Sequence, residues 1–297
     1  MTHQEARFRM ATVLLSADKP LTLRELTTAA DLTGIFAREA ADQLILSGQA
    51  LLLEQPGQEP TYRWATPLDP TSAAKPPALD SPIVRHFIDY ILHDYSPPAH
   101  THTLAIFQCC VGRPFYRTQS HAFMRHAVEA ATGLDPWRDA STCPVHVVVL
   151  GSWIGPVPYE LQTIHPATVS ATGVKQMPDS LYAAARPILV QRMANYLRIH
   201  GPRYRHIATF TDGRYAQIMR DVAQATGRQI AILPDPTGPR VTSYQGGAPR
   251  TYWQRYWIQL ALELSRPSGP KAQAQTLERL RQMGVEATPD SSLLKTA

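Results

Sequence analysis

The sequence contains few cysteines and no pattern that would hold a metal. Three cysteines occur in 297 residues, and two of them, Cys109 and Cys110, are adjacent, which excludes a disulfide framework. No CxxC pair suggests zinc, and His100 and His102 lie in a Pro- and Thr-containing segment where we expect them to be exposed to solvent. We therefore expect neither a metal nor a cofactor.

Long apolar runs are also lacking. No segment approaches the length of a membrane span, and the N-terminus mixes charged with apolar residues, unlike a signal peptide. These absences predict a cytoplasmic protein without membrane contact. Hydrophobic residues make up 44% and charged residues 18% of the chain, which is the composition of a folded globular protein.

Lysine is scarce among the basic residues. Of 29 lysines and arginines only five are lysines, and the net charge is +5 with an isoelectric point near 9.2. The planar guanidinium of arginine suits phosphate groups and stacks on bases, so this composition favours a nucleic-acid partner. A GC-rich genome that favours arginine codons explains the same bias, and composition alone does not separate the two explanations.

Residues 1–66 are predicted to form a winged-helix domain. One helix begins after Thr22 as its N-cap, and a later helix covers residues 35–46. Two strands on either side of a Pro-Gly turn then form the wing. Arg38 of the later helix and Arg63 of the wing are the candidate nucleic-acid contacts. Because few basic residues mark this surface, a role in packing or dimerisation remains an open alternative.

After a Pro-rich linker at residues 67–82, helices alternate with apolar strands over residues 83–235. This alternation predicts an α/β domain with an open parallel sheet and helices on both faces. Residues 236–297 are predicted to form a helical C-terminal extension, whose aromatic residues at helical spacing belong to the core. The predicted strands are 104–107, 145–150, 206–210 and 229–233, and the predicted helices include 83–92, 118–132, 179–200, 213–226 and 271–283.

Small and polar residues follow each predicted strand. Because the carboxyl ends of parallel strands meet at one edge of a sheet, these residues predict a ligand pocket at that edge. They are Cys109 and Cys110 after the first strand, Ser152 and Gly155 after the second, Thr211 and Asp212 after the third, and Asp235 after the fourth.

The first strand end belongs to a longer motif. Residues 104–121 read LAIFQCCVGRPFYRTQSH, in which a cysteine is followed after three residues by Arg-Pro-Phe, then by Thr and by His. This spacing resembles the core motif of the archaeosine synthase family, where a cysteine precedes Lys-Pro-Tyr, Ser and His. The resemblance covers roughly residues 100–233 and implies a fold like that of uracil-DNA glycosylases. A second motif of the family is similar to Ser152, Gly155, Val157-Pro158, Glu160-Leu161, His165-Pro166 and Thr172-Gly173.

The resemblance implies an enzyme that modifies a 7-cyano-7-deazaguanine base in DNA or tRNA, as an amidine-forming transferase that joins an amine to the nitrile carbon. Cys109, its thiolate stabilised by Arg113 and a helix N-terminus, would attack the nitrile, and His121 would transfer protons. Glu160 would orient Arg113 or the small-molecule amine donor. Phe115 would stack on the base. The residues expected to line the substrate pocket are Phe115, Thr118, Ser152, Gly155, Thr211 and Asp212.

The chain departs from the family motif at three positions. Arg113 replaces lysine, Phe115 replaces tyrosine and Thr118 replaces serine. An arginine cannot supply a neutral amine, and Phe115 lacks the hydroxyl of a proton donor. The transglycosylase-like and PUA modules of the family are not apparent. A winged helix stands in their place, which favours DNA over tRNA as the target.

Two other functions remain open. A glycosylase-like enzyme that flips and excises a base would need a carboxylate to activate water, and Asp212 and Asp235 are the candidates. A non-catalytic nucleic-acid-binding or regulatory protein would keep the pocket for a small ligand. The pairing of Cys109 with His121 favours an enzyme, whereas the winged helix favours the regulatory protein.

Overall fold

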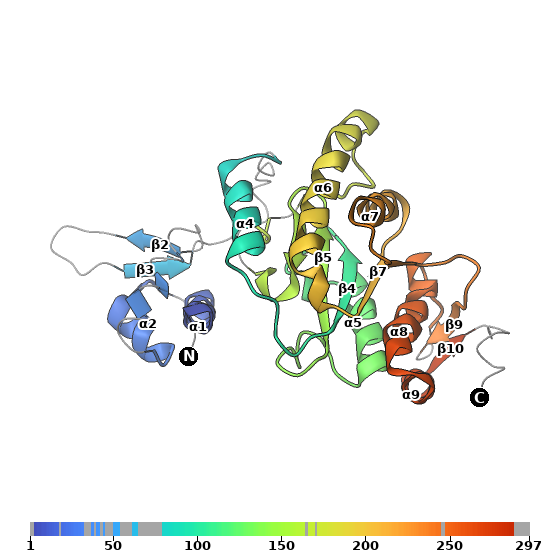
Figure 1. Cartoon of the computed structure of the whole chain (residues 1–297). Coiled ribbons are helices and arrows are strands. Elements are labelled where there is room, and N and C mark those ends of the chain that lie inside the picture. Colours follow the sequence, from blue (N-terminus) through green and yellow to red (C-terminus); the bar gives the residue numbers. More distant parts are fainter. Residues whose placement is uncertain are drawn as a thin grey trace. The chain divides into compact units, whose positions relative to one another are not determined.

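The computed structural model describes residues 3–287, apart from 18, 33–36, 39, 42–43, 45–49, 54–60, 65–78, 164–165, 170 and 245–246. The chain divides into two compact units (Figure 1). One unit comprises Met1–Lys75 with Ile164–Val169, and the other comprises Pro76–Thr163 with Ser170–Ala297.

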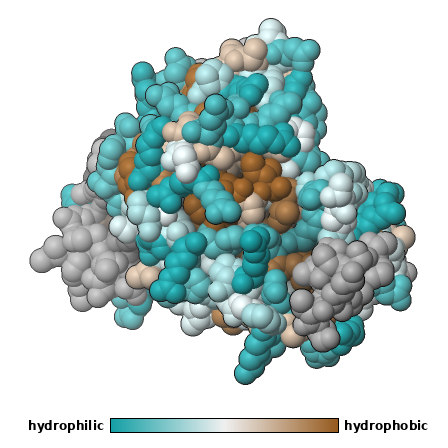
Figure 2. All heavy atoms as spheres, turned by 45° about the vertical axis from the view of Figure 1, so that its right-hand side comes forward, coloured by the Kyte–Doolittle hydropathy of each residue, from teal (hydrophilic) through white to brown (hydrophobic). Residues whose placement is uncertain are grey.

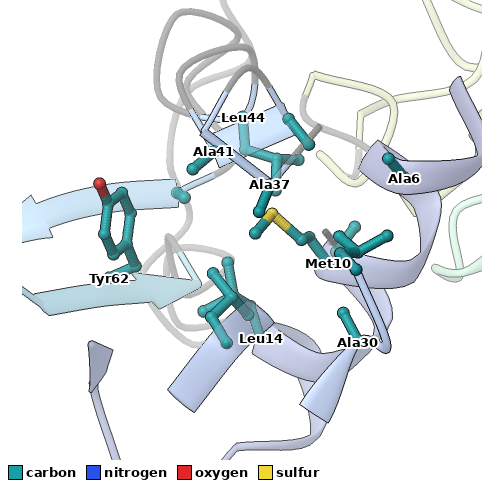
Figure 3. Packing of buried hydrophobic residues seen from close by; sticks show 13 residues of the cluster. Ala6, Met10, Leu14, Ala30, Ala37, Ala41, Leu44 and Tyr62 are labelled. Atoms are coloured by element: carbon teal, nitrogen blue, oxygen red, sulfur yellow. The ribbon is translucent and has the colours of Figure 1, made fainter. Parts of the chain in front are cut away.

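The first unit contains helices α1 (His3–Ser16) and α2 (Leu23–Ala29) and a sheet of β1 (Leu21–Thr22), β2 (Ala50–Leu53) and β3 (Thr61–Trp64). The strands are antiparallel, in the order β1-β3-β2. Its core is built from residues of α1 and α2, of the helical segment that contains Ala37 and Leu44, and of β2 and β3. The buried side chains drawn in Figure 3 include Ala6, Met10, Leu14, Ala30, Ala37, Ala41, Leu44 and Tyr62.

The predicted start of α2 is confirmed. Thr22 is the N-cap, its hydroxyl accepts a hydrogen bond from the backbone of Glu25 at 3.2 Å, and the Glu25 carboxylate accepts from the backbone of Thr22 at 2.8 Å. Of the helix predicted at 35–46, residues 37–38, 40–41 and 44 are helical, and the others lie outside the described residues. The turn of the predicted wing and most of the predicted linker also lie outside them.

The second unit is organised around a sheet of five strands. These are β4 (Thr103–Gln108), β5 (Val145–Gly151), β6 (Gly155–Pro158), β7 (His206–Phe210) and β8 (Ala231–Leu233), in the order β6-β5-β4-β7-β8. Four strands are parallel, close to the predicted ranges, and β6 pairs antiparallel with β5. The sequence pattern missed β6 because its prolines suggest a turn, although an edge strand tolerates residues without a backbone N–H.

Helices cover both faces of this sheet. They are α4 (Pro82–His93), α5 (Gln119–Thr132), α6 (Asp179–Ile199), α7 (Gly213–Thr226), α8 (Trp257–Ser265) and α9 (Pro270–Gln282). α5 leads from β4 to β5, whereas α6 and α7 lead to strands in the opposite direction along the sheet. Because such crossovers are right-handed, α5 lies on one face and α6 and α7 lie on the other. The packing agrees, since α5 contacts α8 and α9 while α6 contacts α4 and α7 (Figure 1).

The C-terminal extension is not purely helical. Its strands β9 (Val241–Tyr244) and β10 (Val285–Ala287) form an antiparallel pair that the sequence pattern did not predict. In α8, Trp257, Leu260 and Leu264 are buried, as expected for core positions at helical spacing. Short 3₁₀ turns at Phe115–Arg117, Tyr159–Leu161, Gly201–Arg203, Trp253–Arg255 and Arg266–Ser268 complete the described elements.

The surface is mainly hydrophilic on the side shown in Figure 2, where hydrophobic residues gather in a central patch. No helix among the described residues has both the length and the apolar character needed to cross a membrane.

We expect Thr22→Ala to loosen α2. The substitution removes the hydroxyl that satisfies a helix N–H, a loss of about 1 kcal/mol, so amide hydrogens of α2 should exchange about fivefold faster. Thr28→Ala is the matched control, because the Thr28 hydroxyl donates only to the carbonyl of Arg24 within the same helix. Hydrogen exchange of the full chain followed by mass spectrometry measures both variants. Equal exchange in Thr22→Ala and wild type would contradict a capping role.

Candidate functional site

The carboxyl ends of β4 and β7 lie side by side at the point where the connections leave the sheet in opposite directions. The chain passes from β4 to α5 on one face and from β7 to α7 on the other. Open α/β sheets form their ligand crevices at such a point. The side chain of Gln108 bridges the two strand ends, because its Oε1 accepts a hydrogen bond from the backbone N–H of Asp212 at 3.1 Å.

Cys109 is the first residue after β4 and is 7% exposed. Its backbone N–H donates to the carbonyl of Leu150 at 3.2 Å, which ties it to the end of β5. The Cys109 sulfur lies 3.4 Å from Nη2 of Arg113 and 4.0 Å from Oγ of Ser152. The structure thus brings together three residues that the sequence assigned to one pocket.

Arg113 is held by the loop that carries it. Its Nη1 donates to the carbonyls of Gly112 at 3.0 Å and Val111 at 3.3 Å and also to that of Cys110, and its guanidinium lies 4.0 Å from the centre of the Phe115 ring. A guanidinium stays charged at any physiological pH. A fixed positive charge beside a sulfur favours the thiolate over the thiol.

The N-terminus of α5, which was expected beside Cys109, contacts Cys110 instead. Thr118 is the N-cap of α5, with its hydroxyl accepting from the backbone of His121 at 3.4 Å, and it lies 3.3 Å from the Cys110 sulfur. Burial raises the pKa of Cys110, so this thiol stays protonated at neutral pH. Thr118 therefore has a capping role in addition to any contact with a ligand.

His121 is fully buried between two aromatic rings. It stacks on Phe115 at a centroid distance of 5.0 Å and on Tyr159 at 5.8 Å, and its Nδ1 lies 3.3 Å from the Tyr159 hydroxyl. Burial, and after it the charge of Arg113, lower the pKa of His121 to about 3. The expectation that His121 transfers protons rested on an ordinary pKa. The imidazole is instead neutral at neutral pH. Phe115 is 1% exposed and contacts His121 and Arg113.

Glu160 lies near the amino ends of the parallel strands, whereas Cys109 lies at the carboxyl end of β4. Because β6 runs antiparallel to β5, the chain returns to the start of β5, where the Glu160 carboxylate accepts from the Tyr95 hydroxyl at 2.5 Å and lies 3.3 Å from Nε2 of His146. Burial opposes the ionisation of Glu160, but its contacts with His146 and Tyr95 outweigh burial and lower its pKa. The expectation that Glu160 orients Arg113 is therefore corrected.

The remaining predicted pocket residues lie at or near the ends of β5, β7 and β8. Ser152 and Thr211 are buried, and the Asp212 carboxylate forms an ion pair with Lys175. Gly155 has a φ of 91°, and a Cβ there would lie 3.1 Å from Cβ of Arg192, so this glycine serves the turn into β6. The Asp235 carboxylate accepts from the backbone and hydroxyl of Thr237 at 2.8 and 2.7 Å.

Tyr215 belongs to the same site, and sequence analysis missed it. It lies in the first turn of α7 and is 1% exposed. Burial, and after it the electrostatic interaction with Cys109, raise the pKa of Tyr215 well above its ordinary value. The sequence predicted a helix at 213–226, and no motif marked the Tyr215 hydroxyl.

The other candidates are placed as follows. His100 and His102 are exposed, and the described residues contain no cluster of three or more His, Cys, Asp or Glu side chains suited to a metal. Arg38 is exposed in a helical segment, and Arg63 pairs with Leu51 in the sheet, although its side chain lies outside the described part. His165 also lies outside it.

Comparison with known proteins relates the second unit to one family. A family model described as "Domain of unknown function (DUF5591)" matches residues 84–243, more than half of the chain. The alpha subunit of archaeosine synthase from Thermococcus kodakarensis is 26% identical over 161 residues, which are 54% of this chain and 26% of that protein. The chain therefore matches about a quarter of the length of this relative. The crystal structure of AF0587, a protein of unknown function, has a TM-score of 0.39 and 14% identity over 68% of this chain and 58% of that one.

The low pKa of His121 predicts how stability depends on pH. The folded state holds a neutral imidazole with a pKa of about 3, whereas the unfolded chain has the ordinary value of 6.5. The stability that this residue contributes is complete above pH 6.5 and is lost as the pH falls toward 3, by up to about 1.4 kcal/mol per pH unit.

His121→Phe should keep the stack with Phe115 and Tyr159 but cannot gain a proton. We expect its urea midpoint to fall less steeply with acidification than that of wild type. His102→Gln, at an exposed position, should keep the wild-type slope. Parallel pH profiles for wild type and His121→Phe would show that the imidazole is not held neutral by the fold.

Proposed function

The chain belongs to the DUF5591 family, and from this membership and the geometry around Cys109 we propose that it is an enzyme that modifies a base in DNA or tRNA. The main support for the proposal is the position of the Cys109 sulfur. It lies at the carboxyl end of β4, where the connections leave the sheet in opposite directions, and is 3.4 Å from the Arg113 guanidinium. The similarity to a subunit of archaeosine synthase supports a nucleic-acid substrate and a transferase.

The proposed substrate group is the nitrile of a 7-cyano-7-deazaguanine base. The Cys109 thiolate attacks the nitrile carbon, a C–S bond forms, and one π electron pair moves to the nitrogen, which takes a proton. A small-molecule amine then adds to the same carbon, and the thiolate leaves to give an amidine and free Cys109. Each step balances without ATP or a redox partner.

The residues around the sulfur fit this chemistry in different ways. Arg113 supplies the positive charge that stabilises the thiolate. Ser152, whose hydroxyl lies 4.0 Å from the sulfur, is the proposed contact for the nitrile group. His121 is neutral and buried, so its proposed role is to hold the Phe115 ring on which Arg113 lies. The Asp212 carboxylate forms an ion pair with Lys175.

Excision of the base is less well supported. A glycosylase would use Asp212 or Asp235 to activate water. Asp212 is paired with Lys175, and the Asp235 carboxylate accepts two hydrogen bonds from Thr237. Both carboxylates thus have partners, whereas the Cys109 sulfur lies beside a cation. These contacts favour attack by sulfur over attack by water.

We also propose that residues 1–66 form a winged helix that binds the nucleic acid, with DNA as the favoured target. In this proposal residues 67–82 are a linker, residues 83–235 a core like that of uracil-DNA glycosylases, and residues 236–297 an extension. Its support is the pair of helices followed by antiparallel strands and the exposed position of Arg38.

The chemistry is tested with an oligonucleotide that carries 7-cyano-7-deazaguanine. Without an amine donor, the full-length protein should form a covalent adduct whose mass is the sum of protein and oligonucleotide, because addition to a nitrile releases no group. Cys109→Ala should form none. Cys143→Ala is the matched control, since Cys143 is buried and burial raises its pKa to about 11. An adduct on Cys109→Ala, or none on wild type, would refute attack by this sulfur.

The winged-helix proposal is tested by the salt dependence of binding to duplex DNA. Arg38→Gln should weaken binding and reduce the slope of log affinity against log salt by about one, as expected for the loss of one phosphate contact. Arg85→Gln, at an exposed position of α4, is the control that should leave the slope unchanged. Identical slopes for wild type and Arg38→Gln would exclude a phosphate contact by this residue.

A further inference from the structure

The 3₁₀ turn Trp253–Arg255, which precedes α8, lies at the same edge of the sheet as the candidate site. Gln259, in the first turn of α8, accepts a hydrogen bond from the backbone N–H of Asp235 at 2.8 Å and donates to the Asp235 carbonyl at 2.8 Å. Asp235 follows the end of β8 by two residues. Trp253 packs edge-on against Phe123, early in α5, at a centroid distance of 5.5 Å. These contacts fix the turn between the end of β8 and the helix that follows β4.

Tyr252 and Arg255 share one face of this turn. The backbone N–H of Arg255 donates to the carbonyl of Tyr252 at 3.1 Å, and side chains three residues apart in a 3₁₀ turn stand in line. Tyr252 is 48% exposed, and Arg255 is exposed as well. The ring of the buried Tyr256 lies 4.9 Å from that of Tyr252. The Tyr252 ring is therefore supported by the protein and yet accessible to a ligand.

The segment around this turn carries positive charge only. Residues 236–262 contain three arginines, Arg240, Arg250 and Arg255, and no lysine, aspartate or glutamate. Arg250 and Arg255 are exposed, and in the described part of the chain their guanidinium groups form no ion pair. The planar guanidinium of arginine suits phosphate, so the charge around Tyr252 complements a nucleic-acid strand.

The pKa of Tyr252 agrees with this location. Burial raises it first, followed by Tyr256 and by the carboxylates of Asp212 and Asp235, which belong to the ends of β7 and β8. The phenol thus keeps its proton at neutral pH, and an uncharged ring stacks on a base without repelling the neighbouring phosphates.

We propose that Tyr252 and Arg255 form a contact for a single nucleic-acid strand, in which the Tyr252 ring stacks on an unpaired base and Arg255 binds the adjacent phosphate. Aromatic rings with neighbouring arginines bind single strands in this way, because every base has a π face and every nucleotide carries a phosphate. A base that reacts at Cys109 must leave the duplex, so the strand beside it is unpaired at this edge. The inference rests on the proposed function in taking a nucleic acid as the substrate.

The stacking contact is tested by binding of unmodified single-stranded DNA to the full-length protein, followed by fluorescence anisotropy. Tyr252→Leu removes the ring and should weaken binding at least about fivefold, the effect of losing one stacked base. Tyr252→Phe keeps a ring that stacks and should stay within about twofold of wild type. Ile199→Ala is the matched control, because Ile199 is 46% exposed and ends α6, the helix that leads to the start of β7. It should bind as wild type does.

The phosphate contact is tested by the salt dependence of the same binding. Arg255→Gln should reduce the slope of log affinity against log salt by about 0.7, as expected for one phosphate of a single strand. Arg220→Gln, exposed on α7 at the other face of the sheet, should keep the wild-type slope.

An abasic strand of the same length separates the two contacts, because it keeps the phosphates and lacks the bases. Tyr252→Leu should bind this strand as tightly as wild type does, whereas Arg255→Gln should still bind it more weakly. Equal binding of ordinary single-stranded DNA by Tyr252→Leu and wild type, or an equal loss on both strands, would overturn the stacking contact. An unchanged salt slope in Arg255→Gln would overturn the phosphate contact.

These measurements use no nitrile and no adduct, so they are separable from the test of the chemistry. A failed adduct with the nitrile-bearing oligonucleotide, together with binding that depends on the Tyr252 ring, would refute the proposed chemistry alone. An adduct together with binding that is independent of Tyr252 would refute this inference alone.

Discussion

The divergence of the chain on either side of β4 and β7 is the constraint on which the site depends. Right-handed crossovers place α5 and α7 on opposite faces, so the connections diverge between the ends of these strands. Asp212 follows β7 by two residues, and its backbone N–H donates to the side chain of Gln108, the last residue of β4, directly before Cys109. The location of the Cys109 sulfur is thus a consequence of strand order and not of the loop sequence alone.

Arg113 is the cation that lies beside the Cys109 sulfur. Arg113 is held by three backbone carbonyls and by the ring of Phe115, and its guanidinium lies 3.4 Å from the Cys109 sulfur. Its charge adds to burial in lowering the pKa of His121 and so keeps this imidazole neutral. An imidazolium at the same place would repel the guanidinium. The neutral histidine therefore does not repel Arg113, and it stacks on the Phe115 ring that the guanidinium contacts.

Much of the core was predictable from sequence because buried parallel strands are nearly continuous apolar runs, and β4, β5 and β7 follow those runs closely. The short strands β6, β9 and β10 were missed. The expectation that Glu160 orients Arg113 or the amine donor came from the family resemblance. β6 reverses the direction of the chain and carries Glu160 to the amino ends of the parallel strands, beside His146. Tyr215 was missed for a different reason, since helical spacing marks a residue as buried but does not say what its hydroxyl faces.

The departures from the archaeosine synthase motif are best understood together. A lysine at position 113 has no planar face, whereas the guanidinium of Arg113 lies flat enough to contact the Phe115 ring at 4.0 Å while donating to the loop carbonyls. Phenylalanine suits a ring that is 1% exposed and stacked on His121, where a phenol hydroxyl would need a partner. Thr118 keeps the hydroxyl that caps α5, as a serine would. The substitutions thus preserve a positive charge beside the sulfur while changing the group that carries it.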